Sequence, residues 1–417
     1  MQNKCVYIFL SIFFLFSCAE KGKDFSRDKN VIRLPEKVTI QEVNLSSVAS
    51  GLKYVALETN DSVLVSSITK IMYENGRIVL VDKDHNCFLF DEDGRFVSKV
   101  GRKGNGPNEY MYIRSIDIIP DRNVLFTYDH MLQKLLFYDL EKGDVVNVYK
   151  MPNIQEKDEE RGVDIRSILY LFNGYYYVDV VSWFDLSFKG IVFKIEDDID
   201  IDKQYHLDVK YPKTPKSLSL THEVGIMFRG ESELRCYKHI SDTIFSIDNN
   251  LNLYSAYVFK MGKYKATYSY MFDKVHNMEM KYVFPVNIME SSNYLFIEYF
   301  FGNHAPEPFE YIHVNDRGEK GIAINRKGYC LWDKSTGESI FLKQPIKGKP
   351  GFKNDLDGGA IIWPHYISRN KEIVAFCDAD KFQETLTDPS NSPPFVSALI
   401  QKVQPDDNPV VIIGKLK

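Results

Sequence analysis

The chain has 417 residues, a formal net charge of −5 and a pI of about 6.0. Its 52 basic and 57 acidic residues are mixed along the sequence, whereas a nucleic-acid-binding protein shows clustered Lys and Arg. Nucleic acid is therefore excluded as a partner. A length above that of an average domain suits one large all-β domain or a repeat array.

The first 17 residues have the three parts of a signal peptide. A polar start carries one positive charge, Lys4, an apolar stretch runs from Val6 to Phe16, and the small residue Ser17 follows. An apolar run of this length is too short for an ordinary membrane span. Residues 1–17 are therefore predicted to direct export and to be removed.

The segment Leu15-Phe16-Ser17-Cys18 looks like a lipobox, in which Cys18 receives the lipid and becomes the mature N-terminus. Phe16 is bulkier than the residue usual at its position, so an ordinary secretory signal is the alternative. Stable anchoring takes more than one acyl chain. By resemblance to lipoprotein sorting, Ala19 favours the outer membrane and leaves open whether the periplasmic or the outer surface carries the protein.

A polar run rich in Lys and Asp follows Cys18. Such composition does not support a packed core and is typical of linkers. We expect residues 18–36 to form the lipidated Cys and a flexible tether, and residues 37–417 to form the folded domain.

Four cysteines remain in the expected domain: Cys87, Cys236, Cys330 and Cys377. Four thiols allow three disulfide pairings, and their spacing selects none of them. None forms a C-x-x-C pair, so we interpret all four as buried strand residues.

One unit of four short β-rich runs recurs along the chain. Its clearest copy spans Ile68–Val100, with turns at Asn75-Gly76 and Asp93-Gly94. These dipeptides favour β-hairpin turns because Gly tolerates positive φ. The unit therefore predicts an antiparallel four-stranded meander, the blade of a β-propeller.

Four further copies follow, and their first recognisable strands lie near Ile113, Ile165, Leu234 and Asn287. The turn of the last hairpin recurs at Gly94, Gly143, about Asp198 and Asn249, which gives steps of 49, 55 and 51 residues. The next step, to Gly337, is 88 residues and indicates an insertion across roughly 302–325.

The C-terminal part supplies three runs, one fewer than a blade needs: Gly359–Trp363, Ile373–Cys377 and Val410–Ile413. The fourth strand is expected from the N-terminal part, either Lys37–Val43 or Lys53–Leu57. Pairing the first strand with the last removes exposed edges. The prediction is an all-β, six-bladed propeller. A pair of β-sandwich domains would need a linker near the middle, and no Pro-, Ser- or Gly-rich boundary is present there.

Four segments make the chain similar to a known family: Leu52–Thr59, Gly101–Tyr110, Ser241–Ile247 and Asn408–Ile413. They resemble the six-bladed β-propeller lipoproteins of gut Bacteroidetes, whose blades are similar to those of NHL-repeat propellers. The resemblance covers nearly the whole mature chain. It implies the fold, export and lipidation, and it supplies no catalytic residues.

The segment Gly101–Tyr110 contains the first candidate site. The candidate anion-binding residues are Arg102, Lys103, Gly104, Asn105 and Gly106. Backbone N–H groups of such a glycine-rich loop can cradle an anion. A phosphate loop, however, opens a helix after a strand, and here Pro107 and another strand follow. The alternative is a connection between blades whose glycines allow tight turning near the central channel.

The second candidate site is the segment 301–309 at the start of the insertion. It reads as an exposed loop, and its candidate binding residues are Phe301, His304 and Phe309. Exposed aromatic faces suit sugar stacking or a protein partner.

Motifs for catalysis or metal binding are absent from the sequence. The nine histidines are scattered singly, and neither H-E-x-x-H nor G-x-S-x-G occurs. The acidic run Asp197–Asp202 lacks the Gly and Glu that a calcium loop requires at its sixth and twelfth positions. No metal and no cofactor are expected.

The sequence thus favours a binding module over an enzyme. We expect a monomeric, lipid-tethered propeller that presents its channel and loops to a glycan, a peptide or an envelope protein. The alternative is a hydrolase or lyase acting on a polysaccharide or lactone at the channel mouth, since different blades can bring two carboxylates together. Carboxylates or histidines with perturbed pKa values at the mouth would favour the enzyme. Neutral polar and aromatic groups there would favour binding.

Overall fold

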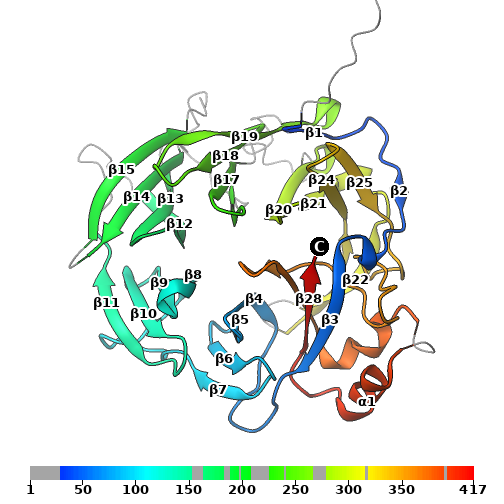
Figure 1. Cartoon of the computed structure of the whole chain (residues 1–417), viewed down its shortest axis with the longest axis horizontal. Coiled ribbons are helices and arrows are strands. Elements are labelled where there is room, and N and C mark those ends of the chain that lie inside the picture. Colours follow the sequence, from blue (N-terminus) through cyan, green and yellow to red (C-terminus); the bar gives the residue numbers. More distant parts are fainter. Residues whose placement is uncertain are drawn as a thin grey trace, which may run out of the picture.

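The computed structural model describes residues 29–152, 163–182, 188–196, 199–207, 225–238, 241–265, 279–314, 318–388 and 392–417. Six antiparallel four-stranded sheets follow one another in chain order around a common axis and form a closed ring (Figure 1). The predicted six-bladed β-propeller is confirmed. The predicted signal peptide, residues 1–17, and the predicted lipid acceptor Cys18 lie outside the described residues.

In the first three blades every strand pairs with the next one in sequence. Blade 1 contains β4 (Ile68–Glu74), β5 (Arg77–Asp82), β6 (Cys87–Asp91) and β7 (Phe96–Lys99). Blade 2 contains β8 (Ile113–Ile119), β9 (Val124–Asp129), β10 (Lys134–Asp139) and β11 (Val145–Lys150). Blade 3 contains β12 (Val163–Tyr170), β13 (Tyr175–Ser182), β14 (Phe188–Ile195) and β15 (Ile199–Leu207).

Blades 4 and 5 each gain a fifth strand on their outer side, taken from the N-terminal segment. Blade 4 contains β16 (Gly225–Arg229), β17 (Leu234–Lys238), β18 (Thr243–Ile247) and β19 (Leu253–Lys260), and β1 (Val31–Arg33) is added in parallel. Blade 5 contains β20 (Phe284–Glu290), β21 (Tyr294–Phe300), β24 (Lys327–Asp333) and β25 (Glu338–Leu342), and β2 (Ile40–Gln41) is added in parallel.

A separate hairpin is inserted in blade 5. Its strands β22 (Phe309–Val314) and β23 (Lys320–Asn325) pair only with each other among the described strands. The predicted insertion across roughly 302–325 is therefore present, and it is a two-stranded ribbon.

The strand patterns follow from the stacking of blades. Middle strands such as β5 and β9 are buried at nearly every position, because both faces of each sheet pack against a neighbouring blade. The outer strand β7 alternates instead between half-buried and exposed residues. The turn between β4 and β5 uses Asn75 and Gly76, with φ of 51° and 71°, which is the backbone that a two-residue hairpin requires.

Chain direction defines two faces of the ring. We call the face that holds the connections between blades, such as residues 100–112, the upper face. The turns between the first and second strands, such as Asn75-Gly76, lie on the lower face. Each innermost strand therefore runs from the upper face to the lower face, and its residue order gives its depth in the ring.

Blade 6 closes the ring with strands from both ends of the chain. It contains β26 (Tyr366–Ile367), β27 (Glu372–Cys377), β28 (Val410–Leu416) and β3 (Ala49–Ala56). β3 pairs antiparallel with β28, with Ala56 opposite Val410. Of the two predicted closing segments, Lys53–Leu57 is therefore correct. Lys37–Val43 instead contains β2 of blade 5.

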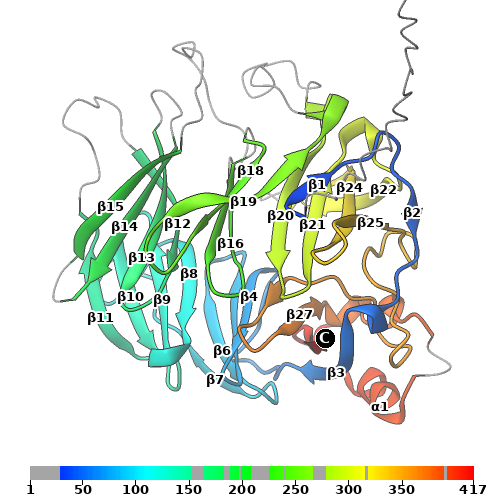
Figure 2. The same ribbon diagram turned by 45° about the horizontal axis from the view of Figure 1, so that its top comes forward.

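Two predictions for the ends of the chain are wrong. The expected tether, residues 18–36, includes β1, in which Val31 and Ile32 are buried against blade 4 because they are apolar and pair with β19. In Figure 2 this N-terminal segment runs along the outside of blades 4 and 5. The expected strand Gly359–Trp363 forms only isolated bridges, and the innermost strand of blade 6 is the two-residue β26.

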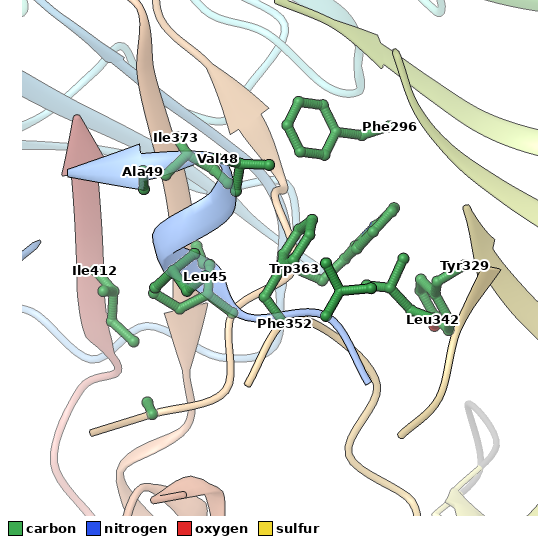
Figure 3. Packing of buried hydrophobic residues seen from close by; sticks show 14 of the residues in the cluster. Leu45, Val48, Ala49, Phe296, Tyr329, Leu342, Phe352, Trp363, Ile373 and Ile412 are labelled. Atoms are coloured by element: carbon green, nitrogen blue, oxygen red, sulfur yellow. The ribbon is translucent and has the colours of Figure 1, made fainter. Parts of the chain in front are cut away.

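Residues 359–363 help to fill the junction of blades 5 and 6. Trp363 is buried there against Phe296, Phe352 and Tyr329, with ring centroids 4.9–6.0 Å away. Leu45 and Val48, which precede β3, pack in the same cluster (Figure 3). The short helix α1 (Pro394–Lys402) contributes to it as well. The N-terminal segment thus joins these blades through its core as well as through β3.

Candidate functional site

The innermost strands of all six blades surround a cavity of about 700 Å³ on the ring axis. Its lining comes from β4, β8, β12, β16, β20 and β26, together with neighbouring turns on the upper face. This volume lies in the range of small-molecule binding sites. The cavity is therefore the candidate functional site.

Two of the carboxylates in the lining are held by basic residues of blade 4. Asp117 of β8 is buried and forms an ion pair with Arg229 of β16, and it also accepts the N–H of Tyr170 at 3.0 Å. Asp179 of β13 forms a buried ion pair with Lys238 of β17.

The third carboxylate, Glu290 at the end of β20, has three donors. Arg235 Nε lies 2.9 Å from one oxygen, and Lys334 Nζ and the hydroxyl of Tyr257 lie 2.5 and 3.0 Å from the other. Both oxygens of this carboxylate are therefore occupied by donors of the protein itself. The three carboxylates of the lining thus serve to join blades.

Basic residues line one half of the cavity. Lys70 of β4, Arg114 of β8 and Arg166 of β12 come from three consecutive blades. Lys70 is exposed, the two arginines are half-buried, and Lys70 Nζ donates to the carbonyl of Arg114 at 3.1 Å. Their positions near the start of each innermost strand place them in the upper part of the ring.

Apolar residues line the other half. The half-buried side chains there are Ile226 and Met227 of β16, Val286 of β20, Ile367 of β26 and Phe376 of β27. The halves meet between blades 3 and 4, where the hydroxyl of Ser167 lies 3.2 Å from the sulfur of Met227. Apolar residues thus line both sides of the cavity, Ile68 and Leu169 among those of blades 1–3, and Arg229 adds a basic residue from blade 4.

Two histidines complete the lining. The ring of His85, in the turn between β5 and β6, lies 3.9 Å from that of Tyr112, and the ring of His365 lies 4.4 Å from that of Phe376. Partial desolvation by the surrounding side chains lowers the pKa of both imidazoles below the usual 6.5. Both rings are therefore neutral at neutral pH.

A smaller pocket of about 190 Å³ lies on the lower face. Arg229, Glu290 and Ile367 line both spaces. Beside them, the buried Glu74 accepts the hydroxyl of Tyr366 at 2.8 Å and the N–H of Arg369 at 2.9 Å. Burial raises the pKa of Glu74. This layer of polar residues forms the floor of the cavity.

A family model described as "Domain of unknown function (DUF4934)" matches residues 29–415, which include all six blades and both ring-closing strands. The chain belongs to this family. None of the curated proteins matches it.

Solved structures similar to this DUF4934 protein include two from Bacteroides. A Bacteroides fragilis protein described as exported is 18% identical, with a TM-score of 0.62 over 93% of this chain and 99% of that one. A Bacteroides vulgatus member of the DUF4221 family is 13% identical, with a TM-score of 0.49 over 89% and 97% of the two chains. At 18% identity, the similarity to the Bacteroides fragilis structure supports the fold alone.

The predicted anion-binding loop, Gly101–Tyr110, is occupied by a carboxylate from its own sequence. The carboxylate of Glu109 accepts the N–H of Gly106 at 2.9 Å and lies 3.4 Å from Arg102 Nε. It sits so close to Gly104 that a Cβ there would be 2.0 Å from it. The backbone also closes on itself, because Tyr110 N donates to the carbonyl of Arg102.

The first candidate site is therefore a connection between blades. Lys103 donates to the carbonyl of Asp84, and Asn105 is exposed. None of the five candidates Arg102, Lys103, Gly104, Asn105 and Gly106 lines either pocket. The structure therefore supports the alternative that Pro107 and the following strand indicated, a connection between blades.

The second candidate site is corrected at Phe301. Its side chain is buried against Tyr299 and Phe341, because the chain turns inward after β21 before entering the hairpin. His304 is exposed, and its ring lies 4.9 Å from that of Tyr264; Phe309 is half-buried. These three residues do not form one exposed surface.

Sequence reasoning missed the cavity residues. Lys70, Arg114 and Arg166 share one detectable feature, a basic residue inside the apolar first run of a repeat. That feature points to a water-accessible innermost strand. The ion pairs that hold the carboxylates join residues 44–112 positions apart, and no local pattern reveals them.

The described part of the chain contains no helix long and apolar enough to cross a membrane. Cys87, Cys236 and Cys330 are buried and Cys377 is half-buried, each as a free thiol in a strand.

Proposed function

We propose that the protein is an exported, lipid-anchored binding module that holds its ligand in the central cavity. The observation that carries the proposal is a cavity of about 700 Å³ in which all three lining carboxylates are held in ion pairs. Such a lining offers fixed charges and apolar surface for recognition, and it lacks a carboxylate free for acid–base chemistry.

Export and anchoring are supported by other observations. Residues 1–17 have the pattern of a signal peptide and Cys18 stands at its end. The similar Bacteroides fragilis structure belongs to a protein described as exported. The ligand would then be an envelope molecule, such as part of a glycan, a peptide or an envelope protein, and the protein would act as a monomer on the outer membrane.

One observation favours the alternative of a hydrolase or lyase. His365 is solvent-accessible in the cavity, and its lowered pKa keeps the imidazole neutral and able to accept a proton. If the protein converts a bound molecule and a His365→Asn variant no longer does so, the function is catalysis and the binding proposal is wrong.

The test uses protein that begins at residue 19, because residues 29–417 include all six blades and both closing strands. Oligosaccharides, peptides and organic acids are screened by thermal shift, and every hit is recovered and analysed for turnover. Met227→Trp, which fills the cavity, should weaken a genuine hit at least about tenfold, a loss of roughly 1.4 kcal/mol. The control Val146→Trp, on an exposed site of β11, should bind normally. Equal binding by both variants would place the ligand elsewhere and refute the proposal.

A further inference from the structure

We propose that the hairpin of β22 and β23 contacts the lipid bilayer to which Cys18 would tether the chain, through a face of three isoleucines. This inference rests on the proposed function, because it assumes the lipid anchor. The hairpin belongs neither to a blade sheet nor to the lining of the central cavity. Its contact with the bilayer would fix which side of the ring faces the membrane.

The three isoleucines lie together because of the register of the hairpin. Ile312 pairs directly with Ile322, and Glu310 pairs with Ile324. Paired residues share one face of a sheet, and so do residues two positions apart on the same strand. Ile312, Ile322 and Ile324 therefore form one apolar surface, which we call the isoleucine face.

The isoleucine face is open to solvent. Ile322 and Ile312 are 77% and 69% exposed, more than any other large apolar side chain in the described part of the chain, and Ile324 is 46% exposed. Single exposed apolar residues are ordinary, whereas a contiguous apolar patch marks a contact with a protein or a membrane. A two-stranded hairpin is also only marginally stable in water unless another element covers its apolar face. The isoleucine face therefore needs an occupant.

The N-terminal segment passes beside the base of the hairpin. The carbonyl of Arg33, at the end of β1, accepts the hydroxyl of Ser339 in blade 5 at 3.3 Å, and the carbonyl of Glu36 accepts the hydroxyl of Tyr264 at 2.6 Å. The ring of Tyr264 lies 4.9 Å from that of His304, which comes shortly before β22. The chain that comes from Cys18 thus reaches the ring next to the hairpin.

The length of the chain before β1 limits how far the bilayer can lie from this place. Ten residues, 19–28, separate Cys18 from the first described residue, and ten fully extended residues span at most about 36 Å. A folded domain of the size of residues 29–417 has a radius of gyration of about 21 Å, so its breadth exceeds this span. An anchored ring therefore stays beside the bilayer, with blade 5 and its hairpin on the near side. The bilayer is accordingly the occupant that we assign to the isoleucine face.

Charged residues place the hairpin at the surface of the bilayer rather than within it. Glu310 and Lys320 lie on the same face as the isoleucines, one toward each end of the hairpin. Such side chains remain among the lipid headgroups, and open sheet edges are excluded from the hydrocarbon. A single acyl chain binds a membrane only marginally, and three isoleucine side chains are no larger. The hairpin therefore orients a protein that its lipid anchor retains, and it does not retain the protein by itself.

Vesicle binding by lipid-free protein tests the isoleucine face. Protein beginning at residue 19 is sedimented with phosphatidylcholine vesicles at millimolar lipid, where weak binding is measurable. The double variant Ile312→Thr/Ile322→Thr should bind at least about tenfold less tightly than the wild type. Threonine keeps the β-branched shape that favours strands, so the pairing of the hairpin is retained. The matched control, Val146→Thr/Val148→Thr at exposed positions of the outer strand β11, should bind like the wild type.

The lipid-anchored protein tests where the contact lies. Mature lipidated protein is reconstituted into vesicles whose acyl chains carry bromine, which quenches tryptophan fluorescence on contact. Ile322→Trp adds one tryptophan to the isoleucine face and should lose more fluorescence than the wild type. Val146→Trp adds one on the outside of blade 2, across the ring from blade 5, and should show no additional quenching (Figure 1).

The outcomes separate the membrane contact from the lipid anchor. Equal vesicle binding by the isoleucine variant and its control, or equal quenching of Ile322→Trp and Val146→Trp in anchored protein, overturns the contact and leaves the anchor intact. If the lipid-free wild type is a dimer by light scattering and the isoleucine variant is a monomer, the occupant is a second copy of the chain and the membrane contact is wrong. Mature protein that does not associate with vesicles would overturn the anchor and the contact together. Circular dichroism and the melting temperature show whether each variant is folded.

Discussion

Glu74 shows how a residue acquires a role from distant parts of the chain. In the sequence it precedes the turn Asn75-Gly76 and looks like an ordinary turn residue. In the fold it is 1% exposed and accepts hydrogen bonds from Tyr366 and Arg369, which lie 292 and 295 positions away. The turn could be predicted from the sequence because it is local, whereas the burial depends on blade 6 lying beside blade 1.

The buried carboxyl makes stability depend on pH in a defined direction. Because burial raises the pKa of Glu74 above 4.5, the folded state keeps a proton that the unfolded state loses as the pH rises past that value. The free energy of unfolding therefore falls with rising pH until the pKa of the folded state is passed. Glu74→Gln keeps the acceptor oxygen for both hydrogen bonds and removes the ionisation.

We expect Glu74→Gln to gain stability relative to the wild type as the pH rises from about 4 to about 8, by at most about 1.4 kcal/mol per pH unit. Urea unfolding of both proteins across this range measures the difference. A difference that stays constant, or that shrinks with rising pH, would show that Glu74 ionises in the fold as readily as in the unfolded chain.

At the scale of elements, the loop between β7 and β8 shows what a motif can and cannot reveal. The glycines of Gly101–Tyr110 correctly indicate tight turning between blades, because Gly101 and Gly104 have φ of 67° and 157°. The same motif also predicts a loop that binds an anion, and the loop does hold a carboxylate. Its source, Glu109 of the same segment, could not be inferred, since spacing alone does not show that a side chain folds back.

Removing the Glu109 carboxylate should leave the N–H of Gly106 without its acceptor. We expect Glu109→Ala to lower the free energy of unfolding by about 1–2 kcal/mol, the cost of losing hydrogen bonds to a charged group that is partly exposed. Added sulfate should raise the melting temperature of this variant more than that of the wild type, because sulfate can accept the N–H group that Glu109 leaves. Differential scanning calorimetry with matched sodium chloride separates this effect from ionic strength. Equal stabilisation of both proteins by sulfate would contradict the assignment.

At the scale of the whole molecule, the period of the repeats made six blades predictable, because every blade must present the same sequence of strands and turns. The short inner strand β26 was missed, since two residues carry no pattern. The parallel strands β1 and β2 were missed for a different reason. Their partners β19 and β25 are more than 200 residues away, so only the closed ring brings them together.

The anchoring hypothesis also belongs to the whole molecule. Exchanging residues 1–18 for a signal peptide that is cleaved without lipid transfer should move the protein from the membrane fraction to the soluble fraction. Its melting temperature should not change, because the described fold begins after this segment. The matched control is an exchange of residues 1–17 for a foreign lipoprotein signal that keeps Cys18. Protein that still sediments with carbonate-washed membranes after the first exchange would refute lipid anchoring through Cys18.

The pairing of β3 with β28 has a consequence for how the protein is made. β28 (Val410–Leu416) is the last strand of the fold in chain order, so blade 6 lacks a strand until synthesis has passed Leu416. Until then β3 has no β28 to pair with, and blade 1 lacks the neighbour that buries its face. A ribosome that stops early therefore releases an open ring with unpaired edges, which quality-control proteases can recognise. The ring can therefore close only after β28 has been made and has met β3.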